Sequence, residues 1–521
     1  MCLSRSMGTM PLTRLLLAAV QLAVVAIVSE SCHKYRAPDG ESLAHEYCAA
    51  CHAFPDPSLL DQKTWQSGVL PRMATRVGVQ PKFLFDETSR SPYMATLSGK
   101  MSDADWSMIV NYYLTHAPDS LRYETMPTAP ARDPAFFDAQ PFSRDLKSSG
   151  IITLLKVDSV HKRIFVGDAG LGTLQVFDYN RRRLAQVQLE SPATDVIVDG
   201  NQLLVLEVGI LNPNDEARGK LVRYQFQSPD SLRPVGVVLD SLVRPVFVRR
   251  FSPDGTAASE FIVCEYGNNR GRLAIYKPAA NGYSRQVLAA TPGAIRFELR
   301  DMNGDGALDL IALFAQGDER IVMFENDGKG GFAGEQRVLA RFPPVYGSMY
   351  FTMRDFNGDG KLDIVYVNGD NFDYSRVLKP YHGVRILEND GRNNFEERYF
   401  FPVYGASRAQ VADFDGDGRP DILVTSNFAD FARHPERGII FLKNDGNYKF
   451  LPYDFSVAGT SQWNLTAIAR LEDNNLPDVI VGAMDLGNIA QLQRGGSAAQ
   501  AAVPLLLLDN RLRAPIQTQA R

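Results

Sequence analysis

An acidic nine-residue segment that recurs in the second half of the chain limits the fold most strongly. Each copy reads Asp-x-Asn/Asp-Gly-Asp-Gly-x-x-Asp and runs directly into an apolar stretch, at residues 301–309, 355–363 and 413–421. A worn copy ends at Pro477-Asp478, before Val479-Ile480-Val481. The spacing of roughly 55 residues is typical of propeller blades of four strands each. Because strands this short cannot bury their faces alone, the blades must stack in a ring.

A second repeated element falls in phase with the first. Asn-Asp-Gly follows an apolar run and precedes a Phe at residues 326–328, 389–391 and 444–446. This tripeptide supplies the positive-φ residues of a tight hairpin. Less regular apolar runs continue the pattern upstream, near residues 164–167, 203–206 and 261–263. We therefore expect an all-β propeller of about seven four-stranded blades over residues 146–512.

The acidic segments place oxygen-bearing side chains at alternating positions, with a glycine after the third one that allows a sharp turn. Hard oxygen donors at this spacing suit calcium. The segments resemble the start of an EF-hand loop, but they are too short and a β-strand follows. They more closely resemble the FG-GAP/VCBS repeats of integrin-like propellers, a resemblance that covers about residues 290–485.

The FG-GAP/VCBS resemblance implies a set of calcium ligands. These are Asp301, Asn303, Asp305 and Asp309; Asp355, Asn357, Asp359 and Asp363; and Asp413, Asp415, Asp417 and Asp421. The backbone carbonyls of Ala307, Lys361 and Arg419 would complete the sites. In the worn copy Arg470 occupies the first ligand position, which should exclude calcium there. The alternative for the three full copies is an acidic turn that holds no metal.

The N-terminus is typical of an export signal. Two arginines fall within the first 14 residues, and residues 15–28 are almost wholly apolar. That run is too short for a comfortable membrane span, which needs about 20 residues. Cys32 follows it as an acylation cysteine would, although Glu30 does not suit a lipobox. We expect residues 1–32 to direct the protein to the periplasm or cell surface. Lipidation at Cys32, ordinary cleavage and an uncleaved anchor stay open.

The segment Cys48-Ala49-Ala50-Cys51-His52 carries the most specific chemistry of the chain. In a Cys-x-x-Cys-His motif the two thiols add to the haem vinyl groups and the histidine takes the proximal iron position. A redox disulfide or a zinc site fits less well, since no second cysteine pair exists. Cys264 stands alone in a strand-like run, as a buried structural thiol would. We therefore predict covalent haem c in a helical domain over residues 37–118, followed by a Pro-rich linker over residues 119–145.

A helix is expected at the end of this domain. Ser102-Asp103-Ala104-Asp105 has a capping-box pattern, and Trp106, Ile109, Val110 and Tyr113 then share one apolar face. This arrangement resembles the final helix of class I cytochromes c, which packs across the helix that carries the haem motif.

The sixth iron ligand stays open among several residues. The candidates are Met73, Met94, Met101, His45 and His116. Met101 directly precedes the helix cap and is expected to pack on the helix. Met94 falls before the last helix, where an axial methionine often lies. We favour Met73, because its segment resembles a stretch found in cytochrome domains fused to such propellers.

Polar loops are expected on the propeller face opposite the acidic segments. They follow the second strand of a blade, at residues 167–168, 265–270, 369–374 and 426–430. Their Asn, Asp and aromatic side chains could bind a sugar-like or other polar ligand, or dock the cytochrome-like domain. The alternative is a solvated face with ordinary Asx turns.

The whole arrangement resembles bacterial lipoprotein-like proteins that join a monohaem cytochrome c domain to an FG-GAP/VCBS propeller. This architecture implies no single general activity; the leading hypothesis is single-electron exchange with a redox partner protein or a small donor or acceptor, with no catalytic residue assigned. Two alternatives stay open: an oxidoreductase with a substrate site on the propeller, and an adhesion module. Trp463 is the only Trp of the propeller, so the repeated Trp signature of quinoprotein dehydrogenases is missing. The net charge of −5 argues against nucleic-acid binding.

Overall fold

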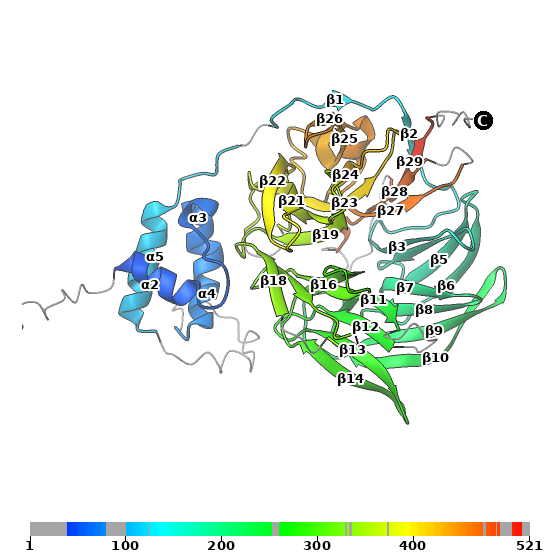
Figure 1. Cartoon of the computed structure of the whole chain (residues 1–521), viewed down its shortest axis with the longest axis horizontal. Coiled ribbons are helices and arrows are strands. Elements are labelled where there is room, and N and C mark those ends of the chain that lie inside the picture. Colours follow the sequence, from blue (N-terminus) through cyan, green and yellow to red (C-terminus); the bar gives the residue numbers. More distant parts are fainter. Residues whose placement is uncertain are drawn as a thin grey trace, which may run out of the picture.

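The computed structural model of the protein places a small group of helices beside a ring of β-sheets (Figure 1). The structure describes residues 39–79, 101–123, 126–252, 260–328, 331–332, 336–371, 375–472, 476–485, 487–489 and 503–512. Residues 1–38, which hold the expected export signal and Cys32, lie outside this part. Within the described ranges, no helix is both long enough and apolar enough to cross a bilayer.

Four α-helices of the helical domain lie within the described residues. They are α2 (Gly40–Cys48), α3 (Gln62–Thr64), α4 (Leu70–Arg76) and α5 (Asp103–His116). A 3₁₀ turn covers Pro57–Leu59, and Trp65–Val69 forms a π-helical turn between α3 and α4. The expected cap of α5 is confirmed, since Ser102 Oγ accepts a hydrogen bond from the Asp105 backbone N–H at 3.0 Å.

Helices α2 and α5 pack closely against each other. A Cβ atom at Gly40 would collide with the carbonyl of Met108, so the glycine allows the two backbones to approach. Ile109 and Tyr113 of the expected apolar face are buried, and they pack with Leu43 of α2 in one core. The apolar face that the sequence predicts for α5 is therefore the face that packs against α2.

Seven blades of four antiparallel strands form the ring, as the repeat predicts, and the sheet of one blade gains a fifth strand. The first three blades are β3–β6 (Ile152–Asp158, Arg163–Asp168, Thr173–Asp178, Arg183–Gln188), β7–β10 (Ala193–Asp199, Gln202–Glu207, Gly219–Ser228, Ser231–Leu242) and β11–β14 (Pro245–Phe251, Glu260–Glu265, Arg272–Ala279, Gly282–Ala289). The next three are β15–β18 (Ala294–Arg300, Asp309–Phe314, Arg320–Phe324, Gln336–Arg341), β19–β22 (Ser348–Arg354, Asp363–Asn368, Gly383–Asn389, Phe395–Pro402) and β23–β26 (Ala406–Ala412, Asp421–Ser426, Ile439–Asn444, Phe450–Asp454).

The seventh blade is assembled from both sides of the propeller sequence. Strands β27 (Trp463–Ala469), β28 (Asp478–Ala483) and β29 (Leu505–Asn510) pair in order, and β2 (Phe137–Pro141) adds the outermost strand beside β29. The inner strands β27 and β3 also contact each other, so the ring is closed. Closure by β2 gives the last blade the backbone hydrogen bonds that an unpaired edge would lack.

The segment at residues 119–145 was predicted to be a linker because it is rich in proline, but part of it belongs to the propeller. Besides β2 it contains β1 (Ala131–Arg132), which pairs in parallel with β26. The prolines argue against a strand in the sequence, but Pro is tolerated at strand ends and on edge strands, which is where these strands lie. The propeller therefore begins before residue 146.

The second strand of each blade is buried on both faces. All six residues of β16, β20, β24 and β28 are buried. Between blades, Ile311 and Leu313 pack against Phe351 and Tyr366 of the next blade. This burial explains why these strands are continuous apolar runs instead of alternating ones.

The helical domain contacts the propeller at loops that leave the second or fourth strand of a blade. Tyr381 Oη, between β20 and β21, donates a hydrogen bond to the Leu59 carbonyl at 2.9 Å. Arg76 Nη2 donates to Asn269 Oδ1, between β12 and β13, at 2.9 Å. Val345 packs on the helical core from the connection between β18 and β19. The domain therefore contacts the face opposite the acidic loops, which join first to second strands.

Candidate functional site

The cysteine motif lies where α2 ends. Cys48 is the last helical residue, and a turn through Ala49 carries the chain to Cys51 and His52. Cys51 is exposed and Cys48 is half-buried, and both are free thiols. Burial raises the pKa of the Cys48 thiol to about 11, which a hydrogen bond with Tyr113 partly offsets. The two sulfur atoms and the imidazole thus come from one short segment beside the α2–α5 contact.

The ring of His52 is held in one orientation. Its Nδ1 lies 2.9 Å from the Ala53 carbonyl, and since a carbonyl only accepts, Nδ1 carries the proton. That tautomer leaves the lone pair of Nε2 for a metal. Burial lowers the pKa of His52, with smaller opposing effects from the backbone of Ala53 and from Asp318 of the propeller, so the neutral ring is favoured. The chemistry of these donors fits a c-type haem.

The candidates for the sixth ligand differ in their surroundings. Met73 is half-buried on α4 against the helical core, and Met101 is buried there, as its position before the cap predicts. His45 stacks on Phe54, with ring centroids 3.8 Å apart, whereas the exposed His116 contacts the Tyr112 carbonyl through Nδ1 at 2.8 Å. Met94 lies outside the described residues. Met73 as the ligand stays a prediction.

The acidic segments form the loops between the first and second strands of three blades. In each loop the first aspartate accepts hydrogen bonds from two glycine N–H groups; Asp301, for instance, is bonded by Gly304 at 2.7 Å and Gly306 at 2.9 Å. The same pairs recur at Asp355 and at Asp413. The glycines have positive φ, which explains their place in the motif.

The last aspartate of each loop is buried and joins two loops, because it accepts a backbone hydrogen bond from each of them. We call this pair of hydrogen bonds the tie. Asp309 accepts from the N–H of Met302 in its own loop and of Asn326 in the Asn-Asp-Gly turn, both at 2.9 Å. Asp363 and Asp421 make the equivalent pairs, and so does Asp478, with Leu471 and Asn510. The worn loop keeps this tie although Arg470 has replaced its first aspartate, so the tie does not depend on a metal.

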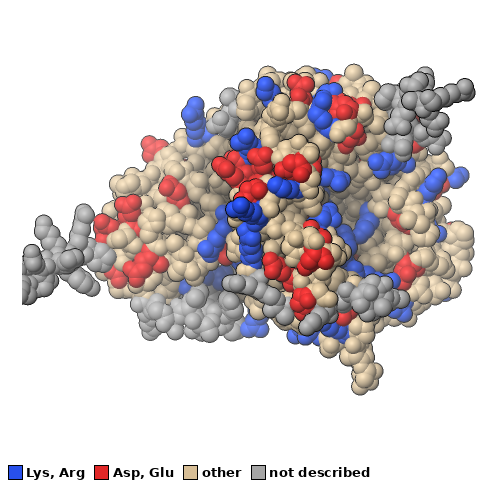
Figure 2. Space-filling model, viewed as in Figure 1, with Lys and Arg blue, Asp and Glu red and all other residues tan. Residues whose placement is uncertain are grey.

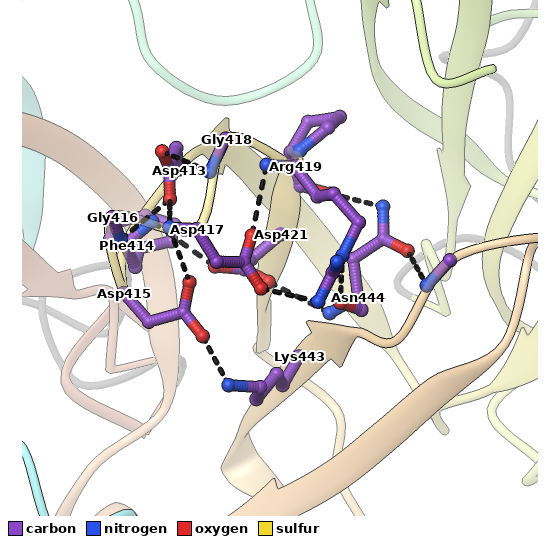
Figure 3. Close-up of polar contacts among 12 residues, drawn as sticks. Asp413, Phe414, Asp415, Gly416, Asp417, Gly418, Arg419, Asp421, Lys443 and Asn444 are labelled. Carbon is purple, nitrogen blue, oxygen red and sulfur yellow. Dashed lines mark hydrogen bonds and ion pairs between the residues drawn. The ribbon is translucent and has the colours of Figure 1, made fainter. Parts of the chain in front are cut away.

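One loop groups three carboxylates closely. Oxygen atoms of Asp413, Asp415 and Asp421 lie within 4.8 Å of one another, while Arg419 holds Asp417 to the side at 2.5 Å (Figure 3). Lys443 also pairs with Asp415. In the other two loops an asparagine takes the second position: Asn303 bonds Asp305 at 3.0 Å, and Asn357 bonds Glu388 at 3.1 Å. The site at residues 413–421 is therefore the strongest cation candidate among the described residues.

Burial changes the acidity of that site. Burial, with smaller effects from the neighbouring Asp415 and Asp417, raises the pKa of Asp421 to about 7, against hydrogen bonds from the backbone of Asn444 and Phe414. A cation between the carboxylates would relieve this repulsion.

Several Asn and Asp side chains of the opposite face are used within the fold. Asp168 accepts from Ser149 N–H at 2.8 Å, Asn371 donates to the Val377 carbonyl at 2.7 Å, and Asn427 donates to the Met484 carbonyl at 3.0 Å. All three are buried. Phe372, Asp373 and Tyr374 lie outside the described residues. What the structure describes of this face therefore fits ordered polar turns.

Sequence reasoning missed the basic side chains of the innermost strands. Arg249, Arg296 and Arg408 lie on β11, β15 and β23, near the axis of the ring. The available signal was weak: arginines that recur in the first strands of three blades, which single blades do not distinguish from surface charge.

Comparison with known proteins agrees with the repeat. Residues 301–366 and 367–424 match the FG-GAP-like repeat. The fold and these repeats define a seven-bladed β-propeller of FG-GAP type. No curated protein matches the chain in sequence.

Solved structures similar to the chain are distant. A nidogen/laminin complex has 13% identity and a TM-score of 0.30, over 48% of this chain and 80% of that one. A luciferin-regenerating enzyme has 11% identity and a TM-score of 0.35, over 56% and 88%. Sqt1 of Saccharomyces cerevisiae has 9% identity and a TM-score of 0.39, over 73% and 99%. These likenesses are too distant to bear on function.

Proposed function

We propose that Cys48, Cys51 and His52 attach haem c and that the protein transfers single electrons after export. The observation that carries this proposal is the arrangement at the end of α2: two free thiols, and an imidazole whose Nδ1 donates to the Ala53 carbonyl. Haem bound there would supply a one-electron iron couple. The partner would be a redox protein or a small electron donor or acceptor.

The residues around the motif have distinct tasks in this proposal. The contact with Ala53 orients the imidazole, since a fixed Nδ1–H sets the direction of Nε2. Tyr113 fixes the C-terminal end of α2 by contacting Cys48, and its hydroxyl donates to the Pro55 carbonyl at 2.9 Å. Asp318 and Arg341 of the propeller are close enough to act electrostatically on His52. The propeller would thus tune the redox site as well as bind a partner.

We also propose that calcium binds the loop at residues 413–421, with Asp413, Asp415 and Asp421 as its protein carboxylates. Support comes from the three oxygen atoms within 4.8 Å of one another. Calcium takes roughly six to eight oxygen ligands, often carboxylates, and these three would supply the charged part of that set. The role would be structural, because the loop connects two strands of one blade and Asp421 also ties it to the Asn444 turn.

Haem attachment is tested by spectra of the full-length protein made in a host that matures c-type cytochromes. After acid–acetone extraction, we expect a pyridine haemochrome of the c type to stay with the polypeptide. The double variant Cys48→Ala/Cys51→Ala should lose it. Cys264→Ala, which changes a buried thiol of β12, is the matched control and should keep it. Haem that extracts fully from the unmodified protein, or a protein without haem, would contradict the proposal.

A further inference from the structure

Basic side chains gather around the axis of the propeller. The seven first strands of the blades follow one another around the ring, from β3 to β27. These strands carry five basic residues that matter here: Lys156, Arg249, Arg296, Arg300 and Arg408. Figure 2 shows Lys and Arg atoms inside the hollow at the centre of the ring. We call this hollow the central channel.

Two buried carboxylates neutralise part of this charge. Asp195 lies between Lys156, with an N–O distance of 3.0 Å, and Arg249, at 2.7 Å. Although burial opposes it, this pair lowers the pKa of Asp195 to about 2. Glu298 pairs with Arg300 at 2.7 Å and more loosely with Arg296 at 3.3 Å. The five basic groups therefore share two carboxylates.

Arg408 has no carboxylate partner within 4.0 Å among the described residues. Its guanidinium carbon lies 5.0 Å from the centroid of the Tyr350 ring, and that of Arg296 lies 4.0 Å from the same ring. The Nε atoms of both arginines are buried and make no hydrogen bond to the described residues. Burial, with a smaller effect from Arg296, lowers the pKa of Arg408 to about 10, against Tyr350 and Asp195.

The position of Arg408 along the ring shows where its side chain extends. It lies on β23, two blades from Arg296 on β15 and three blades from Asp195 on β7. Both of these residues act electrostatically on it. The Arg408 side chain therefore reaches into the channel, while Tyr350 on the intervening strand β19 holds both guanidinium groups by cation–π contact.

Arg296 and Arg408 are only partly exposed, and a charge partly removed from water is stabilised by a counterion or by hydrogen bonds. Guanidinium groups offer forked N–H donors that match the oxygen atoms of carboxylates and phosphates. We propose that the central channel binds a small oxyanion, a carboxylate or a phosphate, between Arg296 and Arg408. The channel site is separate from the haem motif and from the acidic loops, and it does not depend on either.

The test compares anions at equal ionic strength on the full-length protein. We expect inorganic phosphate or malonate to raise the thermal midpoint above its value in chloride, and calorimetry to show one saturable site. Parallel titrations with phosphate and with malonate show whether the site prefers a phosphate or a carboxylate. Arg408→Gln should weaken binding by at least about tenfold. Arg182→Gln, a change at an exposed arginine outside the channel, should leave binding unaffected.

A lack of any effect over chloride in the unmodified protein would overturn the proposal. Binding that persists unchanged in Arg408→Gln would overturn it too. Should Arg408→Gln fail to fold, Arg408→Lys keeps the charge and removes the fork. It should then weaken malonate binding while the circular dichroism spectrum stays unchanged, and full affinity in this variant would count against the site.

Discussion

Single residues of the acidic loops have two separable roles. The first aspartates organise the glycine turn and are exposed or half-buried, whereas the last aspartate is buried and joins two loops by backbone hydrogen bonds. The motif letters do not distinguish these roles, because both are aspartates in a calcium-like pattern. The worn loop does distinguish them, since it lost the first aspartate and kept Asp478.

Replacing Asp478 therefore tests the structural role alone. Asp478→Ala should lower the free energy of unfolding by about 2–4 kcal/mol, because two buried N–H groups lose their acceptor. Denaturant unfolding with and without calcium measures it, and the loss should be the same in both. Asp119→Ala, at an exposed position, should leave stability unchanged. A loss that calcium restores would show that Asp478 acts through a metal.

The raised pKa of Asp421 makes a prediction about pH. Without calcium, the folded chain holds a proton that the unfolded chain releases above its ordinary pKa of 3.8. Stability should therefore fall as pH rises from about 4 towards about 7. Calcium must displace this proton, so its stabilising effect should shrink as pH falls below about 7. Thermal midpoints with excess calcium or excess chelator over this range measure the effect; a calcium effect independent of pH would contradict it.

Elements were predictable wherever the local pattern repeats. The cap of α5 and its apolar face, the acidic loops and the Asn-Asp-Gly turns all occur where the sequence places them. Strand β2 was missed because Phe137–Pro141 has neither an acidic loop nor a turn signal, and its partner β29 lies at the other end of the propeller sequence. Long-range pairing of this kind has no local signature.

The crossing of α2 and α5 depends on one glycine. Gly40→Ala should destabilise the helical domain by about 1–3 kcal/mol, because the new Cβ meets the Met108 carbonyl and the helices must separate. Gly236→Ala on β10, where a Cβ meets nothing within 4 Å, is the matched control. Hydrogen exchange of α5 amides measures the difference. Equal protection of α5 in both variants would show that the close approach is not required.

At the scale of the whole molecule, two contacts between distant segments define the architecture. One is ring closure by β2, and the other is the contact of the helical domain with the propeller, as in Tyr381 with Leu59, which are 322 residues apart. The sequence left open whether the polar face docks this domain. It could not decide, since a tyrosine that bonds a backbone carbonyl looks the same as any other loop tyrosine.

Ring closure can be weakened at one side chain. Phe137 of β2 is buried against Phe414 and Phe441 of the neighbouring blade. Phe137→Ala should lower the free energy of unfolding by about 3 kcal/mol through the cavity it leaves. The amides of β29 should lose exchange protection before those of β12, which lies in a different part of the ring. Uniform loss over all blades would show that β2 does not close the ring independently.

The proposed single-electron role is tested most directly by a redox titration of the full-length protein from a host that matures c-type cytochromes. We expect one reversible transition of the haem α-band between ferricyanide and dithionite, described by a one-electron equation. Cys264→Ala should show the same transition, and Cys48→Ala/Cys51→Ala should show none. A protein that carries no haem, or whose haem band does not change between oxidant and reductant, would contradict the account.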